Sequence, residues 1–92
     1  MYKEIKISAM ESDKGIALNE LKKGSSGTVS NIKATNTATV QKLLAMGILP
    51  GRIIYVIRTY PVYIIQIDNT QVAMDKELAK NIILTKYKKD FV

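Results

Sequence analysis

The carboxylates are the side chains of this sequence with the clearest capacity for acid–base or metal chemistry, because the chain has no histidine and no cysteine. Tight sites for zinc, copper or iron depend on imidazole and thiolate. The common catalytic triads and the usual general base also need histidine. The eight carboxylates are scattered along the chain: Glu4, Glu11, Asp13, Glu20, Asp68, Asp75, Glu77 and Asp90. We therefore expect a protein that is not an enzyme, with no metal site and no other cofactor.

Composition predicts one small globular domain. The chain has 92 residues, and 47% of them are hydrophobic, enough for a folded core. The N-terminal segment lacks the apolar region of a secretory signal. The longest apolar runs of about five residues are far shorter than the roughly 20 that span a bilayer. With no cysteine for disulfides, these features favour a cytoplasmic location.

Positive charge is the strongest bias in the composition. The formal net charge is +6, and the densest basic group is the C-terminal stretch 86–89. We interpret residues 87–92 as a basic, solvated tail. Contact with a nucleic acid or a membrane surface is the alternative, and four lysines at one end would give only weak, salt-sensitive attraction.

The segment from Gln41 onward predicts a short helix with a defined end. Asn36 or Thr37 can cap its first turn, since either side chain can accept from a free N–H. Gly47 stands where a left-handed C-terminal cap would lie, and such a cap would fold Ile48 back onto Leu43.

A turn and a hairpin are predicted after this helix. Pro50 prevents the helix from resuming, and Gly51 permits a positive φ at a tight turn. We therefore assign Gly47, Pro50 and Gly51 a structural role in the turn. Strands are expected over 52–59 and 62–68, with a short return strand over 71–74.

The remaining segments complete a mainly β fold. The predictions are a helical turn over 19–24, a strand over 28–32, a helical turn over 76–80 capped by Asp75, and a strand over 82–85. Residues 1–15 form a leader that could add an extra edge strand. The total of about five short strands and one or two short helices indicates a small antiparallel barrel, SH3-like or OB-like.

The order of these elements resembles the FeoA domain, the ferrous-iron transport protein A family. The central resemblance is the run Met-Gly-Ile-Leu-Pro-Gly at 46–51, followed by a β-branched strand. The flanking matches are Leu18, Leu21, Gly24 and Gly27 upstream, and Val72-Ala73-Met74, Leu78-Ala79 and Ile82 downstream. The resemblance covers about three-quarters of the chain and places the FeoA-like domain at 16–86.

This resemblance implies an SH3-like antiparallel barrel with a cytoplasmic accessory role in ferrous-iron uptake. The implied partner is the FeoB transporter, through its cytoplasmic GTP-binding domain, so that contact with the membrane is indirect. Similar SH3-like domains lie at the end of the iron-responsive repressors of the diphtheria-toxin type, so a regulatory role is the alternative. No nucleic-acid partner is expected, because such barrels use aromatics on a basic face and this chain has no tryptophan and one phenylalanine. An exposed edge strand would permit self-association.

A binding module of this kind acts through its surface. We expect the partner surface to lie around the end of the helix, with aromatic residues of the following loop beside it. The predicted partner-binding residues are Leu44, Met46, Ile48, Leu49, Pro50, Tyr60, Pro61 and Tyr63. The competing interpretation is that Leu43, Ile48 and Val56 belong to the core and that the glycines and Pro50 serve only the turns.

Overall fold

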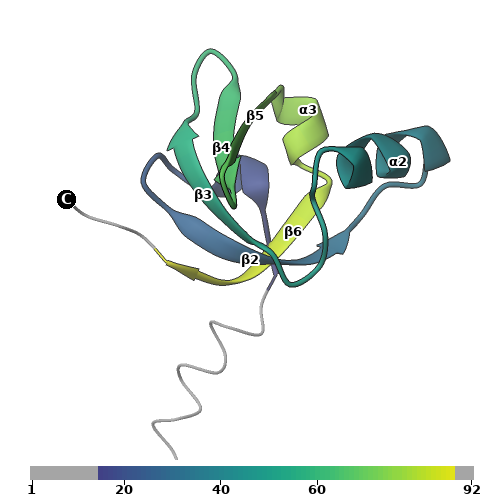
Figure 1. Ribbon diagram of the computed structural model, residues 1–92, viewed down its shortest axis with the longest axis horizontal. Helices are drawn as coiled ribbons and strands as arrows, with labels where there is room; N and C mark the ends of the chain where they lie inside the picture. The colour runs from purple at the N-terminus through teal and green to yellow at the C-terminus, as the bar shows by residue number, and fades with distance from the viewer. Residues whose placement is uncertain (1–14, 89–92) are drawn as a thin grey trace, which may run out of the picture.

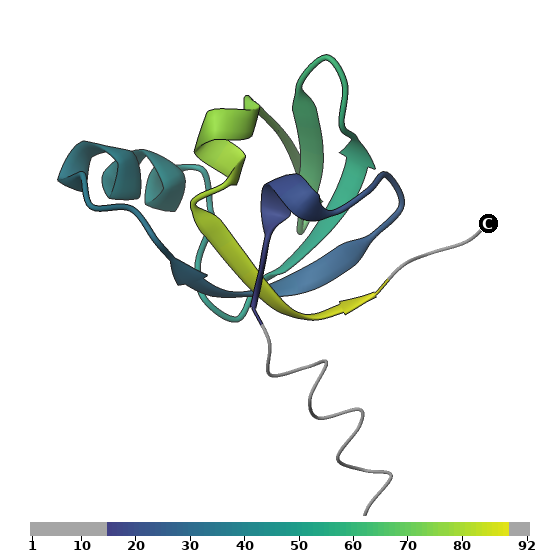
Figure 2. The same ribbon diagram turned by 180° about the vertical axis from the view of Figure 1, so that it is seen from behind.

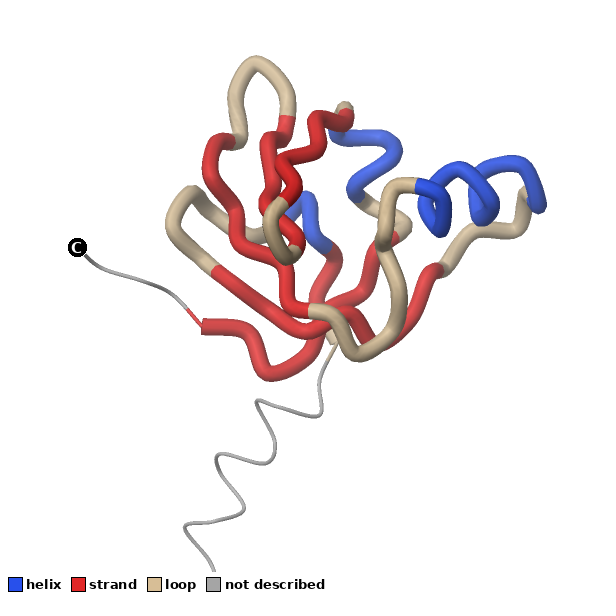
Figure 3. The backbone as a smooth tube through the Cα atoms, in the orientation of Figure 1, coloured by secondary structure: helices blue, strands red, loops and turns tan. Residues whose placement is uncertain are grey.

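The computed structural model describes residues 15–88, which form one curled antiparallel sheet with two α-helices and a 3-10 turn (Figure 1). In chain order the elements are β1 (Ile16–Ala17), η1 (Leu18–Glu20), β2 (Ser26–Ile32), α2 (Thr37–Ala45), β3 (Ile53–Arg58), β4 (Tyr63–Ile67), β5 (Thr70–Met74), α3 (Lys76–Ala79) and β6 (Ile82–Lys88). Figure 3 shows that α2 stands beside the sheet instead of lying inside its curve. The predicted leader, apart from Gly15, and residues 89–92 of the predicted tail lie outside the described residues.

The strands pair in the order β1-β6-β2-β3-β4-β5, and every pair is antiparallel. The predicted mainly β antiparallel architecture is confirmed. A two-residue strand was not predicted: Ile16 pairs with Leu84 and Ala17 with Ile83, along the outer edge of β6. The sheet is barrel-like in its curl, but among the described residues its ladder has two ends, β1 and β5, and does not close.

β6 is longer than the predicted strand 82–85. It continues to Lys88, with Ser26 of β2 opposite Lys88, and Tyr87 packs against the core. The predicted domain end at residue 86 therefore falls inside a strand. Tyr87 and Lys88 belong to the sheet and not to a tail.

The core fills the inside of the curled sheet. Successive side chains of a strand point to opposite faces, so β3 buries Ile54 and Val56, and β4 buries Ile65 and Ile67. The buried apolar residues are Leu18, Leu21, Val29, Leu43, Ile48, Ile54, Val56, Tyr63, Ile65, Ile67, Met74, Ala79, Ile82 and Leu84.

Helix α2 has the N-terminal cap that the sequence predicts. The Asn36 side-chain oxygen accepts from the N–H groups of Ala38 at 2.7 Å and Thr39 at 3.3 Å. These bonds satisfy two of the free donors that every helix start leaves. Leu43 is the buried residue of the helix itself, so the helix touches the core chiefly near its C-terminal end.

The C-terminal end of α2 is a Schellman cap. The Ile48 N–H donates to the Leu43 carbonyl at 3.0 Å, and the Gly47 N–H donates to the Leu44 carbonyl at 3.0 Å. Gly47 has φ +91°, a conformation that L side chains rarely adopt. The cap turns the chain so that Ile48 enters the core beside Leu43, as predicted from the spacing.

The hairpin of β4 and β5 and the short helix after it also follow local chemistry. Asp68 adopts a positive φ of 55° at the predicted turn. Asp75 caps α3, with its carboxylate accepting from the Leu78 N–H at 2.8 Å. The Asn81 side chain donates to the carbonyl of Leu78 at 3.3 Å, where the helix ends.

We predict that Gly47→Ala lowers the free energy of unfolding by about 1 kcal/mol. The added methyl group would meet no heavy atom within 4 Å, so the loss comes from the left-handed backbone alone. Urea denaturation measures it. Gly47→Asn is the control and should lose less, because asparagine tolerates this conformation. An alanine variant as stable as the parent would show that the cap does not hold the helix end.

Candidate docking surface

The residues predicted to bind a partner separate into two surface groups and two core residues. One group, the helix-end patch, consists of Leu44, Met46, Leu49 and Pro50. The other, the loop patch, consists of Tyr60 and Pro61 between β3 and β4. In both Figure 1 and Figure 2, α3 lies between the end of α2 and the loop that follows β3. The two patches therefore do not form one continuous surface.

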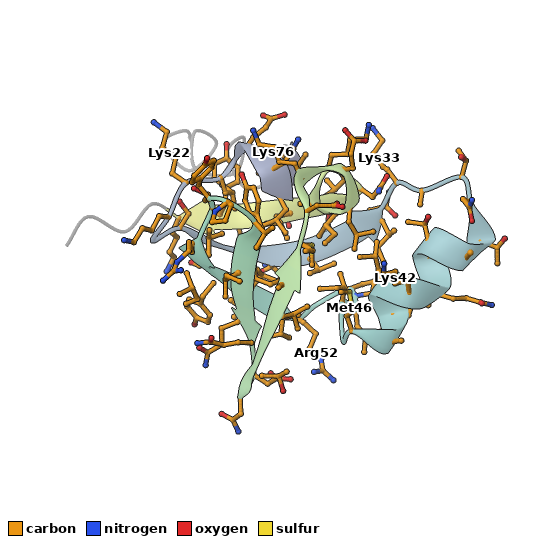
Figure 4. All side chains as sticks on the ribbon, turned by 90° about the horizontal axis from the view of Figure 1, so that it is seen from above. Lys22, Lys33, Lys42, Met46, Arg52 and Lys76 are labelled. Atoms are coloured by element: carbon orange, nitrogen blue, oxygen red, sulfur yellow. The ribbon has the colours of Figure 1, made fainter. Side chains whose placement is uncertain are left out.

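The helix-end patch is apolar and partly exposed. Leu44 is 40% exposed, Pro50 is exposed, and Met46 and Leu49 are half-buried. Met46 packs against the core, and Figure 4 places it between α2 and the sheet. Ile48 is fully buried, so its predicted role as a partner contact is wrong. It belongs to the buried core instead.

A hydrogen-bonded turn holds the helix-end patch against β2. The Leu49 carbonyl accepts from the Arg52 N–H at 3.1 Å, and Gly51 has φ +94°. Proline followed by a positive-φ glycine is the pattern of a type II turn. The Gly51 N–H donates to the Val29 carbonyl, and the Val29 N–H donates to the Arg52 carbonyl, both at 2.8 Å. The predicted structural role of Pro50 and Gly51 fits these bonds, which tie the end of the patch to β2.

The loop patch borders a shallow depression of about 400 Å³. Tyr60 is 82% exposed and is joined to Pro61 by a cis peptide bond. Tyr63 is only 3% exposed, and its hydroxyl donates to the Asn19 carbonyl at 2.9 Å. The partner-contact role predicted for Tyr63 is therefore wrong, because its ring lies in the core. The lining residues are Asn19, Thr59, Tyr60, Pro61, Tyr63 and Lys76.

The carboxylates of the described chain are mostly engaged with local partners. Asp68 accepts from the Arg52 guanidinium, Glu77 pairs with Lys80 at 2.9 Å, and Asp75 caps α3. Most lysines within residues 15–88 form no ion pair with a carboxylate of that part of the chain. Figure 4 shows Lys22, Lys33 and Lys76 along one side of the domain. The result is a positively charged surface that favours acidic partners.

Among residues 15–88, no three acidic side chains come together in a group that could hold a metal ion. In the same part of the chain, no helix is long and apolar enough to cross a membrane.

A third exposed apolar group was missed by the sequence analysis. Ile53, Tyr55 and Ile57 lie on the outer face of β3, while Ile54 and Val56 fill the core. The signal was present in the unbroken apolar run 53–57. A strand with one face in the core exposes every second residue on the other face.

Comparison with known proteins defines first the class of fold and then the family. A Stenotrophomonas maltophilia FeoA complexed with zinc, described as a prokaryotic SH3 domain protein, is similar in structure. Its TM-score is 0.71 at 21% identity over 80% of this chain and 96% of that one. A manganese-dependent transcriptional repressor complexed with manganese matches at TM-score 0.73 and 18% identity, over 77% of this chain and 36% of that one. Both likenesses concern the fold alone, and they confirm the predicted SH3-like architecture.

A third structure and a family model assign the family. The chain is 31% identical to an iron uptake regulatory protein, FeoA, over 78% of its own length and 97% of that protein, with TM-score 0.71. The model of the FeoA domain matches residues 16–86. This chain therefore belongs to the FeoA domain family, which is associated with ferrous-iron transport. No functionally curated protein matches it.

We predict that Tyr63→Phe lowers the free energy of unfolding near neutral pH by about 1 kcal/mol, since it leaves the Asn19 carbonyl without its donor. Burial raises the pKa of the Tyr63 hydroxyl above its ordinary value of 10.0. A folded pKa above the unfolded one means that this contribution is complete below the ordinary pKa and is lost as pH rises through the folded pKa.

Urea denaturation at neutral and alkaline pH, with a tyrosinate absorbance titration, measures both effects. The titration of the Tyr63→Phe variant should lack the tyrosine with the raised pKa. The difference in free energy of unfolding between the variant and the parent should narrow at alkaline pH. Tyr60 is exposed, so Tyr60→Phe is the control and should leave the free energy of unfolding unchanged. Equal stability of the Tyr63→Phe variant and the parent at neutral pH would contradict the assigned hydrogen bond.

Proposed function

We propose that this chain is a cytoplasmic accessory module of a ferrous-iron uptake system that binds the cytoplasmic GTP-binding domain of a FeoB-type transporter and modulates transport. The observation that carries the proposal is the match of the FeoA domain to residues 16–86. The FeoA protein that is 31% identical, itself an iron uptake regulatory protein, supports it.

Binding accounts for this domain better than chemistry does. The chain has no histidine or cysteine, and three carboxylates of the described part are already engaged in two ion pairs and a helix cap. Its distinctive features are exposed apolar groups on a rigid sheet. Small barrels of this kind recognise partners through such surfaces.

The helix-end patch is the proposed docking surface. Leu44 offers an exposed anchor, and the flexible thioether of Met46 can adapt to the partner. The Schellman cap and the turn after it keep the patch in place without the partner, so little conformational freedom is lost on binding. The net positive charge of the chain would attract an acidic surface and make association faster at low salt.

We predict that Leu44→Asp weakens binding to the GTP-binding domain of the FeoB-type transporter encoded in the same genome by about tenfold or more, because it places an unpaired charge in the interface. Calorimetry with the purified domain measures the affinity. Ile57→Asp is the matched control: Ile57 is 37% exposed on β3, close to the 40% of Leu44. It should keep the parental affinity.

Two outcomes would count against this assignment. Parental affinity in a folded Leu44→Asp variant would remove the helix-end patch from the interface. An absence of binding by the parent protein at micromolar concentrations would contradict the proposed partner.

Direct sensing of iron is the competing function, and it requires a site built from oxygen ligands alone. Asp75 and Glu77 are poorly placed to bind iron, because the Asp75 carboxylate caps α3 and the Glu77 carboxylate pairs with Lys80. We predict that anaerobic calorimetry with ferrous iron shows no tight binding to the full chain. Binding at micromolar iron would favour a regulatory role over the accessory one.

A further inference from the structure

The outer face of β3 carries an apolar stripe, which we call the β3 stripe. It consists of Ile53, Tyr55 and Ile57, which are 47%, 51% and 37% exposed. They alternate with the buried Ile54 and Val56, so the three side chains project from the same face over about 13 Å. Contiguous apolar side chains exposed in this way are a mark of contact surfaces in proteins.

Lysines of β6 border this stripe. Ser26 of β2 pairs with Tyr55 on one side and with Lys88 on the other, so these three residues form a row across three adjacent strands. Directly paired residues project from the same face of a sheet. A shallow depression of about 260 Å³ lies over Ser26, with Ile53 and Tyr55 on one side and Lys86 and Lys88 on the other.

Two kinds of occupant, a second copy of this chain and a nucleic acid, fit this surface poorly. A second copy of this chain seated on the same face would bring Lys86 and Lys88 of both copies into one interface, and like charges repel. Nucleic acid needs several aromatic rings for the bases to stack on. This stripe offers one tyrosine between two aliphatic side chains.

An acidic protein surface and an anionic membrane would both complement the charge. Protein hot spots usually insert an anchor into a well-formed pocket, whereas the space over Ser26 is small, about 260 Å³. A bilayer needs no matching shape, only apolar side chains for its interface and cations for its headgroups. The geometry therefore favours the membrane.

We propose that the β3 stripe and the two lysines beside it form a contact site for anionic phospholipid membranes. Ile53 and Ile57 would enter the boundary between headgroups and acyl chains, and the Tyr55 ring would lie at headgroup level with its hydroxyl in water. Lys86 and Lys88 would extend their methylene stems along the apolar stripe and place their ammonium groups on lipid phosphates. This site lies on a different element from the helix-end patch and does not depend on the proposed transporter partner.

Vesicle co-sedimentation of the full chain tests the proposal. The probes are vesicles of phosphatidylcholine alone and vesicles in which about one-third of the lipid is phosphatidylglycerol. The protein should bind the anionic vesicles and not the neutral ones, and the binding should weaken with salt. Failure to bind anionic vesicles at low salt would overturn the proposal, as would equal binding to both kinds.

Two charge variants separate a local site from a general effect of net charge. Lys86→Glu/Lys88→Glu and Lys33→Glu/Lys42→Glu change the net charge by the same amount. The first alters the border of the stripe, and the second alters exposed residues beyond the end of β2 and on α2. The first should weaken vesicle binding by about tenfold or more, and the second much less. Equal losses would overturn the assignment of the site.

Two apolar variants test the stripe itself. Ile53→Ser/Tyr55→Ser should abolish most vesicle binding, while Tyr60→Ser removes the most exposed tyrosine of the described chain from the loop patch and should leave binding unchanged. Circular dichroism of each variant confirms that it is folded. Undiminished binding by the folded Ile53→Ser/Tyr55→Ser variant would contradict the proposal, and so would binding of an oligonucleotide through the same residues without any vesicle binding.

Discussion

The corner from Gly47 to Gly51 is the constraint on which the surface of this domain depends. Gly47 ends α2 in a left-handed cap, and that cap directs Ile48 into the core next to Leu43. Four residues later, Gly51 donates to β2 through the Val29 carbonyl. One short segment thus anchors a helix that buries little of its own surface and starts β3 in the correct register. If either end of the corner were released, Leu44 and the start of the β3 stripe would both lose their positions.

The acidic groups of the described domain serve mainly the fold. Asp75 caps a helix, Asp68 holds Arg52 at a hairpin turn, and Glu77 pairs within α3. The apolar side chains that the core does not absorb lie on three separate elements: the end of α2, the loop after β3, and the outer face of β3. Our two proposals use the first and the last of these surfaces. A domain with separate surfaces can contact a protein and a membrane at once, and such simultaneous contacts raise the effective affinity of each.

Local features of this fold were predictable because neighbouring residues decide them. The caps at Asn36, Gly47 and Asp75 depend on side-chain oxygens and a missing Cβ within a few residues of the bond they serve. The prediction was weaker wherever distant segments meet. The short strand β1 exists only because β6 lies beside it, and β6 continues to Lys88 because β2 supplies a partner at Ser26. No pattern within residues 16–17 or 86–88 contains that information.

The exposure of the candidate site residues also depends on distant segments, whereas the elements that carry them are set locally. The sequence alone determined that the chain contains a capped helix, a proline–glycine turn and alternating strands, and that it lacks the imidazole and thiolate of common active sites. Residue type could not decide which apolar side chains face solvent, because Ile48 and Ile53 are chemically identical and one is buried while the other is half exposed. The curl of the sheet in the tertiary structure determines which of these side chains are buried. The curl encloses Ile48 and Tyr63 on its inner side and leaves every second residue of β3 on the outer side, where the described chain provides no element to cover them.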